Sequence, residues 1–490
     1  MPELEKKPIL NRTQNKWVYW LSVCLAIVVF LVIFGLSYVR VTSPPEGISY
    51  EGDVHFIDEV EFLTDNTYEK NGEVHYEQEI FDRVYDMIES AEKFILLDMF
   101  LFNDEYDREM DFQALSEELA NTLIAAKKRN EELHIVVITD RINTFYGSYQ
   151  SDIHSSLQEN GITVIYTNMK PLRDSNPIYS LAWRKVVQWF GTPEGGWLPN
   201  PFSPDSDKAT VRSYLELLNF KANHRKVIVT EKQGMVTSAN PHDASSLHSN
   251  IAFLFDGDIL EELIETEVAV AKLAGFDLNE LINFDIETNF PSNGQYEIQL
   301  LTEGKIKKHL IQEVSQTIEG DQISVGAFYL SDRDVMKELL AASKRNVRVR
   351  LILDANNDAF GREKNGIPNR SVASELIKKS NSDIEIRWYK TNGEQYHTKL
   401  VYIDKEKNDV LLGGSANFTK RNLADYNLET NVKITADSTT EMMQEVNEYF
   451  ETLWTNDQAT YTADYEEFAD ESYVNQLIYR FQEWSGMSTF

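Results

Sequence analysis

Two copies of one short polar pattern constrain this chain more than any other feature. The second copy runs from His397 to Asn417 and reads H-x-K, four residues, an aspartate, then S-A-N. The first copy runs from His224 to Asn240 and differs in having glutamate at the aspartate position. A single H-x-K is most often an edge-strand histidine beside a solvated lysine. Two copies, each in a longer matching context, instead indicate a shared function.

Each pattern lies on a predicted strand, which explains its spacing. The stretches 227–229 and 400–403 are apolar and rich in β-branched residues, so they predict buried strands. Residues i and i+2 of a strand point to the same face, so the histidine and lysine of each pattern project together. An ammonium beside a neutral imidazole suits a phosphate, because the lysine holds anionic oxygens and the imidazole can attack phosphorus.

The two patterns resemble the paired H-x-K-x4-D and G-S-x-N motifs of the phospholipase D superfamily. The second motif matches fully, whereas the first has Glu231 for Asp and Thr237 for Gly. The similarity covers roughly residues 78 to 435. Within the superfamily, the N-H-R-K form of the first motif is most similar to cardiolipin synthases and related bacterial phosphatidyltransferases.

This resemblance implies a covalent mechanism with no metal and no cofactor. His224 attacks a phosphodiester to form a phosphohistidine, and His397 serves as acid and then as base, although the residues alone permit the reverse assignment. The implied catalytic residues are His224, Lys226, Asn240, His397, Lys399 and Asn417. The supporting residues are Ser238, Ser415, Glu231, Asp404 and Glu429, with Glu231 and Asp404 expected to tie strand to loop.

A carboxylate is expected behind each histidine to fix its tautomer. Glu429 follows Asn417 by twelve residues and fits this role in the second half. The same offset in the first half falls on Ala252, so Asp243 and Asp256 are both left as candidates there.

An internal repeat extends beyond the motifs. Strands predicted at 94–102 and 323–330 are each followed by an acidic loop, a helix ending in AAKKRN or AASKRN, and further strands. The predicted fold is α/β: two pseudo-symmetric phospholipase D-like α/β/α units packed around one active site, after a single N-terminal transmembrane helix. The predicted divisions are a cytoplasmic N-terminus (1–16), a transmembrane anchor (17–39), a stalk and lead-in (40–77), the first repeat (78–257), a linker helix and turn (258–295), the second repeat (296–435) and C-terminal helices (436–490).

The N-terminal segment 17–39 predicts a membrane anchor. Its 23 residues carry no charge, and a helix of this length spans about 34 Å at about 1.5 Å per residue. Lysines and arginines precede the segment, and Arg40 and then acidic residues follow it. This distribution of charge predicts that the N-terminus is cytoplasmic and that the catalytic body lies on the extracytoplasmic side of the cell membrane. A cleaved signal peptide is the alternative, but no A-x-A site follows.

An insertion at 171–222 distinguishes the first repeat from the second. It is rich in aromatic and basic residues and directly precedes the first motif. One interpretation is a core-packing helix with a rigid loop. The other is an interfacial element that holds lipid, through Trp183, Arg184, Trp189 and Trp197. The later segments 442–454 and 474–484 predict amphipathic helices that pack on the second half.

The composition limits the classes of ligand and of metal site that we expect for this chain. The 490-residue chain has a formal net charge of −32, which argues against nucleic acid as its main ligand. Its single cysteine, Cys24, excludes an intramolecular disulfide, and the cysteine and histidine pattern predicts no zinc site. The remaining histidines are expected to have packing or surface roles, with His242 and His248 as candidates to line the site.

The predicted function is therefore a membrane-anchored phospholipase D-type phosphodiesterase or phosphatidyltransferase that acts on phospholipids, similar to cardiolipin synthases. An exported nuclease of the same superfamily is the alternative, and a non-catalytic envelope scaffold is a third. The sequence does not predict an oligomeric state.

Overall fold

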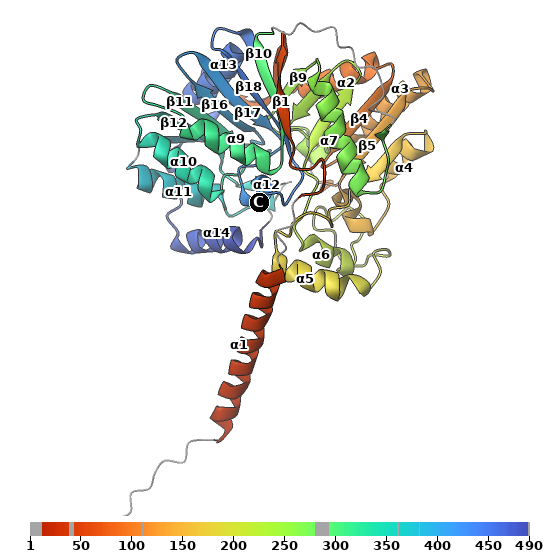
Figure 1. The fold of residues 1–490 in the computed structure, drawn as a ribbon, viewed down its shortest axis with the longest axis vertical. Coiled ribbons are helices and arrows are strands. Elements are labelled where there is room, and N and C mark those ends of the chain that lie inside the picture. Colours follow the sequence, from red (N-terminus) through yellow and green to blue (C-terminus); the bar gives the residue numbers. More distant parts are fainter. Residues whose placement is uncertain are drawn as a thin grey trace, which may run out of the picture.

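The computed structural model describes residues 12–38, 44–109, 111–279, 294–359, 362–381 and 383–488. Side chains are described for all of these except those of residues 12–16, 31–38, 178, 358–359 and 362–363. Two β-sheets flanked by helices form the body, and helix α1 (Arg12–Tyr38) projects from it (Figure 1).

The first half is built on an eight-stranded sheet with the order β3-β2-β9-β8-β7-β4-β5-β6. Strands β4, β5 and β6 are parallel, whereas the strands from β7 to β3 are joined by antiparallel pairing. The strands are β2 (Val60–Lys70), β3 (Glu73–Glu77), β4 (Phe94–Met99), β5 (His134–Thr139), β6 (Thr163–Tyr166), β7 (Lys226–Thr230), β8 (Gly234–Thr237) and β9 (Asn250–Phe255). The helices of this half are α2 (Ile80–Ser90), α3 (Leu115–Arg129), α4 (Asp152–Glu159), α5 (Pro177–Lys185) and α6 (Val211–Leu217).

The second half repeats this plan in a nine-stranded sheet with the order β1-β10-β18-β17-β16-β11-β12-β15-β19. Its strands are β1 (Glu51–Ile57), β10 (Tyr296–Thr302), β11 (Gln322–Ala327), β12 (Arg348–Asp354), β15 (Ile384–Tyr389), β16 (Lys399–Asp404), β17 (Asn408–Gly414), β18 (Thr430–Asp437) and β19 (Thr462–Asp464). The helices are α9 (Gly304–Ser315), α10 (Arg333–Ser343), α11 (Asn369–Ser380), α12 (Lys420–Leu423), α13 (Glu441–Thr455) and α14 (Tyr473–Ser485). A separate hairpin pairs β13 (Asp358–Ala359) with β14 (Arg362–Glu363).

The motif strands occupy matching places in the two sheets. In the first, β7 pairs antiparallel with β4 so that Lys226 lies opposite Met99. In the second, β16 pairs antiparallel with β11 so that Lys399 lies opposite Ala327. Strands β4 and β9 are buried along their whole length, which explains their largely apolar sequences, broken only by Asp98 in β4 and by Asn250 at the start of β9. Each lysine therefore stands at the carboxyl end of the central strand that pairs with it.

The two halves share one hydrophobic core. A single cluster of buried apolar residues joins the first half, for example Phe253 of β9, to the second, for example Leu411 of β17. The halves approach closely at Gly413, where an added Cβ would come within 2.5 Å of the Phe253 ring. Helix α7 (Ile259–Leu273), which agrees with the predicted linker helix, is buried between them. The turn predicted at the end of 258–295 falls mainly on residues outside the description.

The segment 40–77, predicted as a stalk and lead-in, contributes strands to both sheets instead. Strand β1 pairs with β10 at the edge of the second sheet, and β2 pairs with β9 in the first. The C-terminal segment likewise adds β19 to the second sheet beside β15. Single strands with weak alternation carry little local signal, so their pairing is decided by the exposed sheet edges that they cover.

The predicted transmembrane segment 17–39 coincides with most of α1. Throughout the described part of the chain, we find no helix whose length and apolar content suit a bilayer crossing. The structure therefore gives the predicted spanning helix no support; residue 39 and the side chains of 31–38 lie outside the description.

Candidate active site

The two motif histidines are brought together by reciprocal contacts between the halves. The backbone N–H of His224 donates to the carbonyl of Leu428 at 2.9 Å, and that of His397 donates to the carbonyl of Ser249 at 2.8 Å. Each histidine thus follows a short bridge to the opposite half, Asn223 with Leu428 and Tyr396 with Ser249. One site therefore needs both halves, as the sequence predicts.

The carboxylate behind His224 comes from the second half. Nδ1 of His224 donates to Oε2 of Glu429 at 3.0 Å, and Glu429 is fully buried. The same carboxylate accepts hydrogen bonds from Ser415 Oγ, at 2.5 Å, and from the side-chain amide of Asn422. These contacts leave Nε2 of His224 as the nitrogen available for chemistry. Glu429 thus serves the first motif rather than its own half.

An amide takes the equivalent place behind His397. Nδ1 of His397 donates to Oδ1 of Asn250 at 3.1 Å, and Ser238 Oγ donates to the same oxygen at 3.1 Å. Asp243 and Asp256 were the two candidate carboxylates in the first half, and neither of them hydrogen-bonds Nδ1 of a motif histidine. Asp243 accepts from the backbone N–H and the hydroxyl of Ser116 instead. The sequence offers a signal for Asn250, because it follows Ser238 nearly as Glu429 follows Ser415.

The two lysines are buried in matching positions. Nζ of Lys226 donates to the carbonyl of His224 at 2.8 Å, and Nζ of Lys399 donates to the carbonyl of His397 at 2.5 Å. Each ammonium also lies over an aromatic ring, Lys226 at 5.1 Å from the centre of Phe100 and Lys399 at 5.2 Å from that of Phe328. The same two rings lie against the histidines, so each half supplies a histidine, a lysine and a phenylalanine.

Burial favours the neutral form of both histidines before an anion binds. It lowers the pKa of His224 to about 4, against the opposing pull of Glu429, and it lowers the pKa of His397 well below its usual range. Burial also lowers the pKa of Lys226 to about 7, while Lys399, which is buried beside Lys226, has a pKa well below its ordinary value. Glu429 opposes the shift of both lysines only in part, so two crowded lysines favour binding of an anion, which would restore their charge.

Two aspartates outside the motifs position the segments that carry the histidines. Oδ2 of Asp140 accepts the backbone N–H of Asn223 at 2.7 Å, and Oδ2 of Asp354 accepts that of Tyr396 at 2.8 Å. Burial raises the pKa of each aspartate to about 6. Both residues end matching strands of the repeat, and that correspondence was the available signal for their role.

The other predicted site residues are two amides beside the motifs and two carboxylates at the ends of the motif strands. Asn240 and Asn417 are buried beside the motifs. Oδ1 of Asn240 accepts the N–H of Leu101 at 3.2 Å, and the buried Oδ1 of Asn417 has no hydrogen-bond partner in the described part of the chain. Glu231 accepts backbone N–H groups of residues 92–94, which ties the end of β7 to β4. Asp404 ends β16, at the opposite end from Lys399.

The predicted lipid-binding residues of the insertion differ in exposure. Trp189 and Trp197 are largely exposed, whereas Trp183 is buried. Arg184 is paired with Asp174 at 2.6 Å. Trp183 and Arg184 also line a cavity of about 230 Å³ that reaches Asp140. The exposed tryptophans are therefore the ones that can meet a surface.

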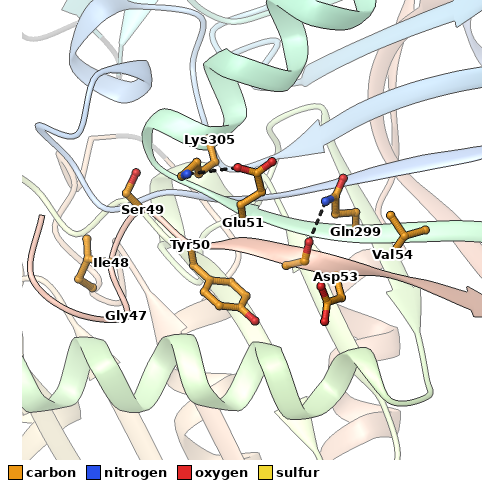
Figure 2. A pocket seen from close by; sticks show the side chains of 10 residues that line it. Gly47, Ile48, Ser49, Tyr50, Glu51, Asp53, Val54, Gln299 and Lys305 are labelled. Atoms are coloured by element: carbon orange, nitrogen blue, oxygen red, sulfur yellow. Dashed lines mark hydrogen bonds and ion pairs between the residues drawn. The ribbon is translucent and has the colours of Figure 1, made fainter.

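Two further histidines and one surface hollow lie outside the two motifs. His248 lies close to His397, with ring centres 5.8 Å apart, whereas His242 bonds Ser245 and the carbonyl of Glu105. The hollow of about 660 Å³ in Figure 2 lies along β1, where Lys305 pairs with Glu51 at 3.1 Å, and no motif residue lines it. Among the described residues, no group of three or more histidine, cysteine, aspartate or glutamate side chains is placed to hold a metal ion.

Comparison with known proteins agrees with this site. A family model described as "Cardiolipin synthase, PLD-like domain" matches residues 297–454. No curated protein matches the chain in sequence. The structure of phosphatidylserine synthase from Haemophilus influenzae Rd KW20 is similar over 89% of this chain and 96% of that one, with 10% identity and a TM-score of 0.55.

A phospholipase D family member, Nuc from Salmonella typhimurium, aligns with 34% of this chain and 97% of its own, at 20% identity and a TM-score of 0.26. The likeness to phosphatidylserine synthase shows a shared fold. The matched domain supports a phospholipase D-like assignment for residues 297–454, and the two H-x-K motifs that meet in one site agree with it.

Proposed function

We propose that this protein is a phosphatidyltransferase that acts on membrane phospholipids through a phosphohistidine intermediate. The observation that carries the proposal is the meeting of two buried histidines and two buried lysines, one of each from either half. The family model that matches residues 297–454 is described as "Cardiolipin synthase, PLD-like domain", and this supports a phospholipid as the substrate.

The first step forms a bond between phosphorus and His224. Nε2 of the neutral imidazole attacks the phosphodiester, and the bond to the leaving alcohol breaks. Oε2 of Glu429, 3.0 Å from Nδ1, stabilises the positive charge that the ring then acquires. For this step His397 is protonated on both ring nitrogens, a form that the negative charge of the bound phosphodiester favours. Its Nδ1 stays bonded to Asn250, and its Nε2 gives the proton with which the alcohol leaves, so that His397 becomes neutral.

The second step reverses the first with a new alcohol. His397 removes the proton of the incoming hydroxyl, the oxygen attacks phosphorus, and His224 is released. We assign Lys226 and Lys399 to hold the nonbridging oxygens throughout, with help from the amides of Asn240 and Asn417, which are buried beside the motifs. The two ammonium groups supply the positive charge that this chemistry requires, so no step is assigned to a metal or other cofactor.

For the finer assignment we favour a cardiolipin synthase-like reaction. One phosphatidylglycerol would give its phosphatidyl group to His224 and release glycerol, and the free hydroxyl of a second would accept that group. Water as the acceptor would instead yield phosphatidic acid. The first half-reaction is the same in both cases.

The protein is further proposed to work at the cell membrane, with its N-terminus in the cytoplasm and its body outside. The charges that flank 17–39 favour this orientation, and exposed aromatic side chains at Trp17, Tyr19 and Trp20 suit an interface. Protease added to spheroplasts should digest the body and spare the N-terminus. Recovery of an intact protein in the soluble fraction would contradict this location.

Product analysis by mass spectrometry tests the activity. The full chain is given phosphatidylglycerol vesicles and, separately, single-stranded DNA, beside His224→Ala and His397→Ala. Cardiolipin and glycerol, absent with both variants, would support the proposal. Cleaved DNA with unchanged lipid would favour the superfamily nuclease and overturn it.

A further inference from the structure

Helix α14 turns its apolar face outward. Tyr473, Val474, Leu477, Phe481 and Trp484 are all exposed, with 69% of Leu477 and 76% of Trp484 accessible. At about 100° per residue, these positions fall within about a third of the helix circumference. A contiguous exposed apolar surface of this kind marks an interaction site.

The inner face of α14 is held by polar contacts. The hydroxyl of Tyr479 accepts from Arg333 Nη1 at 2.9 Å, and Oε2 of Glu483 accepts from Ser331 Oγ at 2.8 Å. Both Tyr479 and Glu483 are buried. The helix is therefore fixed in place by these hydrogen bonds and by the Tyr479 ring, which joins the core of the second half, while its other large apolar side chains face solvent.

The C-terminal end of α14 lies against the insertion of the first half. Gly486, which ends α14 with φ +70°, lies so close to residue 175 that an added Cβ would be 1.8 Å from the carbonyl oxygen of Ser175. Helix α5 begins two residues later, and the exposed Trp189 and Trp197 follow it. In Figure 1, α14 and α5 lie at the same end of the body, where α1 also leaves it.

This end of the body borders the active site. Ser331, which bonds α14, comes three residues after Phe328, whose ring lies 5.0 Å from that of His397. On the other side, Arg421 shares a small cavity with Gln482 and Glu483 of α14 and follows Asn417 by four residues. A surface that covers α14 would therefore lie next to the segments that lead to both His397 and Asn417.

We propose that the exposed face of α14 docks on a phospholipid bilayer and, with Trp189 and Trp197 of the insertion, holds the active-site end against the membrane. This inference rests on the proposed function. Tyrosine and tryptophan at the two ends of an apolar helix face suit the interface of a bilayer. Arg480 is the one basic residue of the helix, so docking is hydrophobic and depends little on salt, in keeping with a chain of net charge −32.

A fluorescent label at α14 tests the docking directly. In the full chain with Cys24→Ser, Leu477→Cys carries an environment-sensitive dye, and Lys128→Cys of the distant helix α3 carries it as the control. Phosphatidylglycerol vesicles should shift the emission of the dye at position 477 to the blue, at low and at high salt, and spin-labelled lipid should quench it. The dye at position 128 should not respond.

Activity gives a second readout. Leu477→Ser, Phe481→Ser and Trp484→Ser are combined, and Ile318→Ser, which removes a similarly exposed apolar side chain elsewhere, is the matched control. Turnover of phosphatidylglycerol is measured in vesicles and as a short-chain lipid in solution. The triple variant should lose about tenfold more activity on vesicles than on dissolved lipid, and the control should lose neither.

The outcomes separate this inference from the proposed function. If the emission of the dye at position 477 does not change when vesicles are added, the docking proposal is wrong. A dye that is shielded without vesicles, in a protein of doubled mass by light scattering, also overturns it, because the face would then join two copies of the chain. If the unmodified protein turns over neither form of lipid but the dye inserts, the proposed function fails while the docking stands.

Discussion

Nδ1 of His224 donates to the carboxylate of Glu429 at 3.0 Å, although the two residues are 205 positions apart and lie in opposite halves. The matching nitrogen of His397 meets the amide oxygen of Asn250 at 3.1 Å. The fold is pseudo-symmetric, but the electrostatics behind the two histidines are not. A carboxylate stabilises a positively charged ring and an amide does so less, and on this ground we propose His224 as the nucleophile.

Replacing the carboxylate should slow catalysis strongly. Glu429→Gln keeps the shape but places an amide NH₂ among donors, because Ser415, Asn422 and Nδ1 of His224 all point at this group. We expect kcat to fall about 10²- to 10⁴-fold with little change in KM.

Glu231→Gln is the matched control, since Glu231 bonds backbone N–H groups of residues 92–94. It should lower the melting temperature while kcat stays within about threefold. Equal losses of kcat in the two variants would remove the special role of Glu429.

The nucleophile can be identified with a substrate whose leaving group needs no proton. With a p-nitrophenyl phosphodiester, His397→Asn should release one equivalent of p-nitrophenolate and then stop, because His224 is phosphorylated but no base activates the acceptor. His224→Asn should show no burst. Stopped-flow absorbance measures both, and a burst from the His224 variant alone would exchange the two roles.

Anion binding should weaken at alkaline pH. The pKa of Lys226 is lowered to about 7 by burial, although Glu429 opposes the shift, so the lysine loses its proton as the pH rises through that value. Sulfate keeps its charge in this range, and its affinity should fall by up to about tenfold per pH unit above about pH 7. Calorimetry from about pH 6 to about pH 9 measures this dependence.

The same titration in Glu429→Gln provides the test of cause. Removal of the negative charge takes away the interaction that raises the pKa of Lys226, so the loss of affinity should begin at a lower pH. An affinity that stays constant to about pH 9 in the unmodified protein would show that the lysines remain charged.

A buried cluster of charged side chains stabilises the segment that carries Glu429. Arg225 is fully buried, with Nη1 at 3.0 Å from Glu267 and Nη2 at 2.7 Å from Glu303, and Glu303 also accepts the backbone N–H of Glu429 at 3.0 Å. Arg225→Met should lower the free energy of unfolding by about 3–5 kcal/mol, because it leaves buried carboxylates unpaired.

Urea denaturation followed by circular dichroism measures this loss. Arg83→Met is the control, since the pair of Arg83 with Glu61, at 2.6 Å, lies at the surface and should contribute less than about 1 kcal/mol. Similar losses in the two variants would mean that the buried cluster does not determine stability.

The sequence alone determined the strands and the chemistry that they carry. Stretches such as 94–99 and 322–327 form strands because they are rich in apolar residues, and the i, i+2 spacing places each histidine with its lysine on one face. The repeat then predicted two similar units and a shared site.

Only the tertiary structure decided which groups support the two histidines and what each surface does. Glu429 and Asn250 act across the halves, through contacts between segments that are far apart in the sequence, and no local pattern records such pairing. The amphipathic pattern of α14 predicted a helix but not its orientation. Hydrogen bonds from Arg333 and Ser331 hold its polar side inward, and this is why its apolar side is left for another partner.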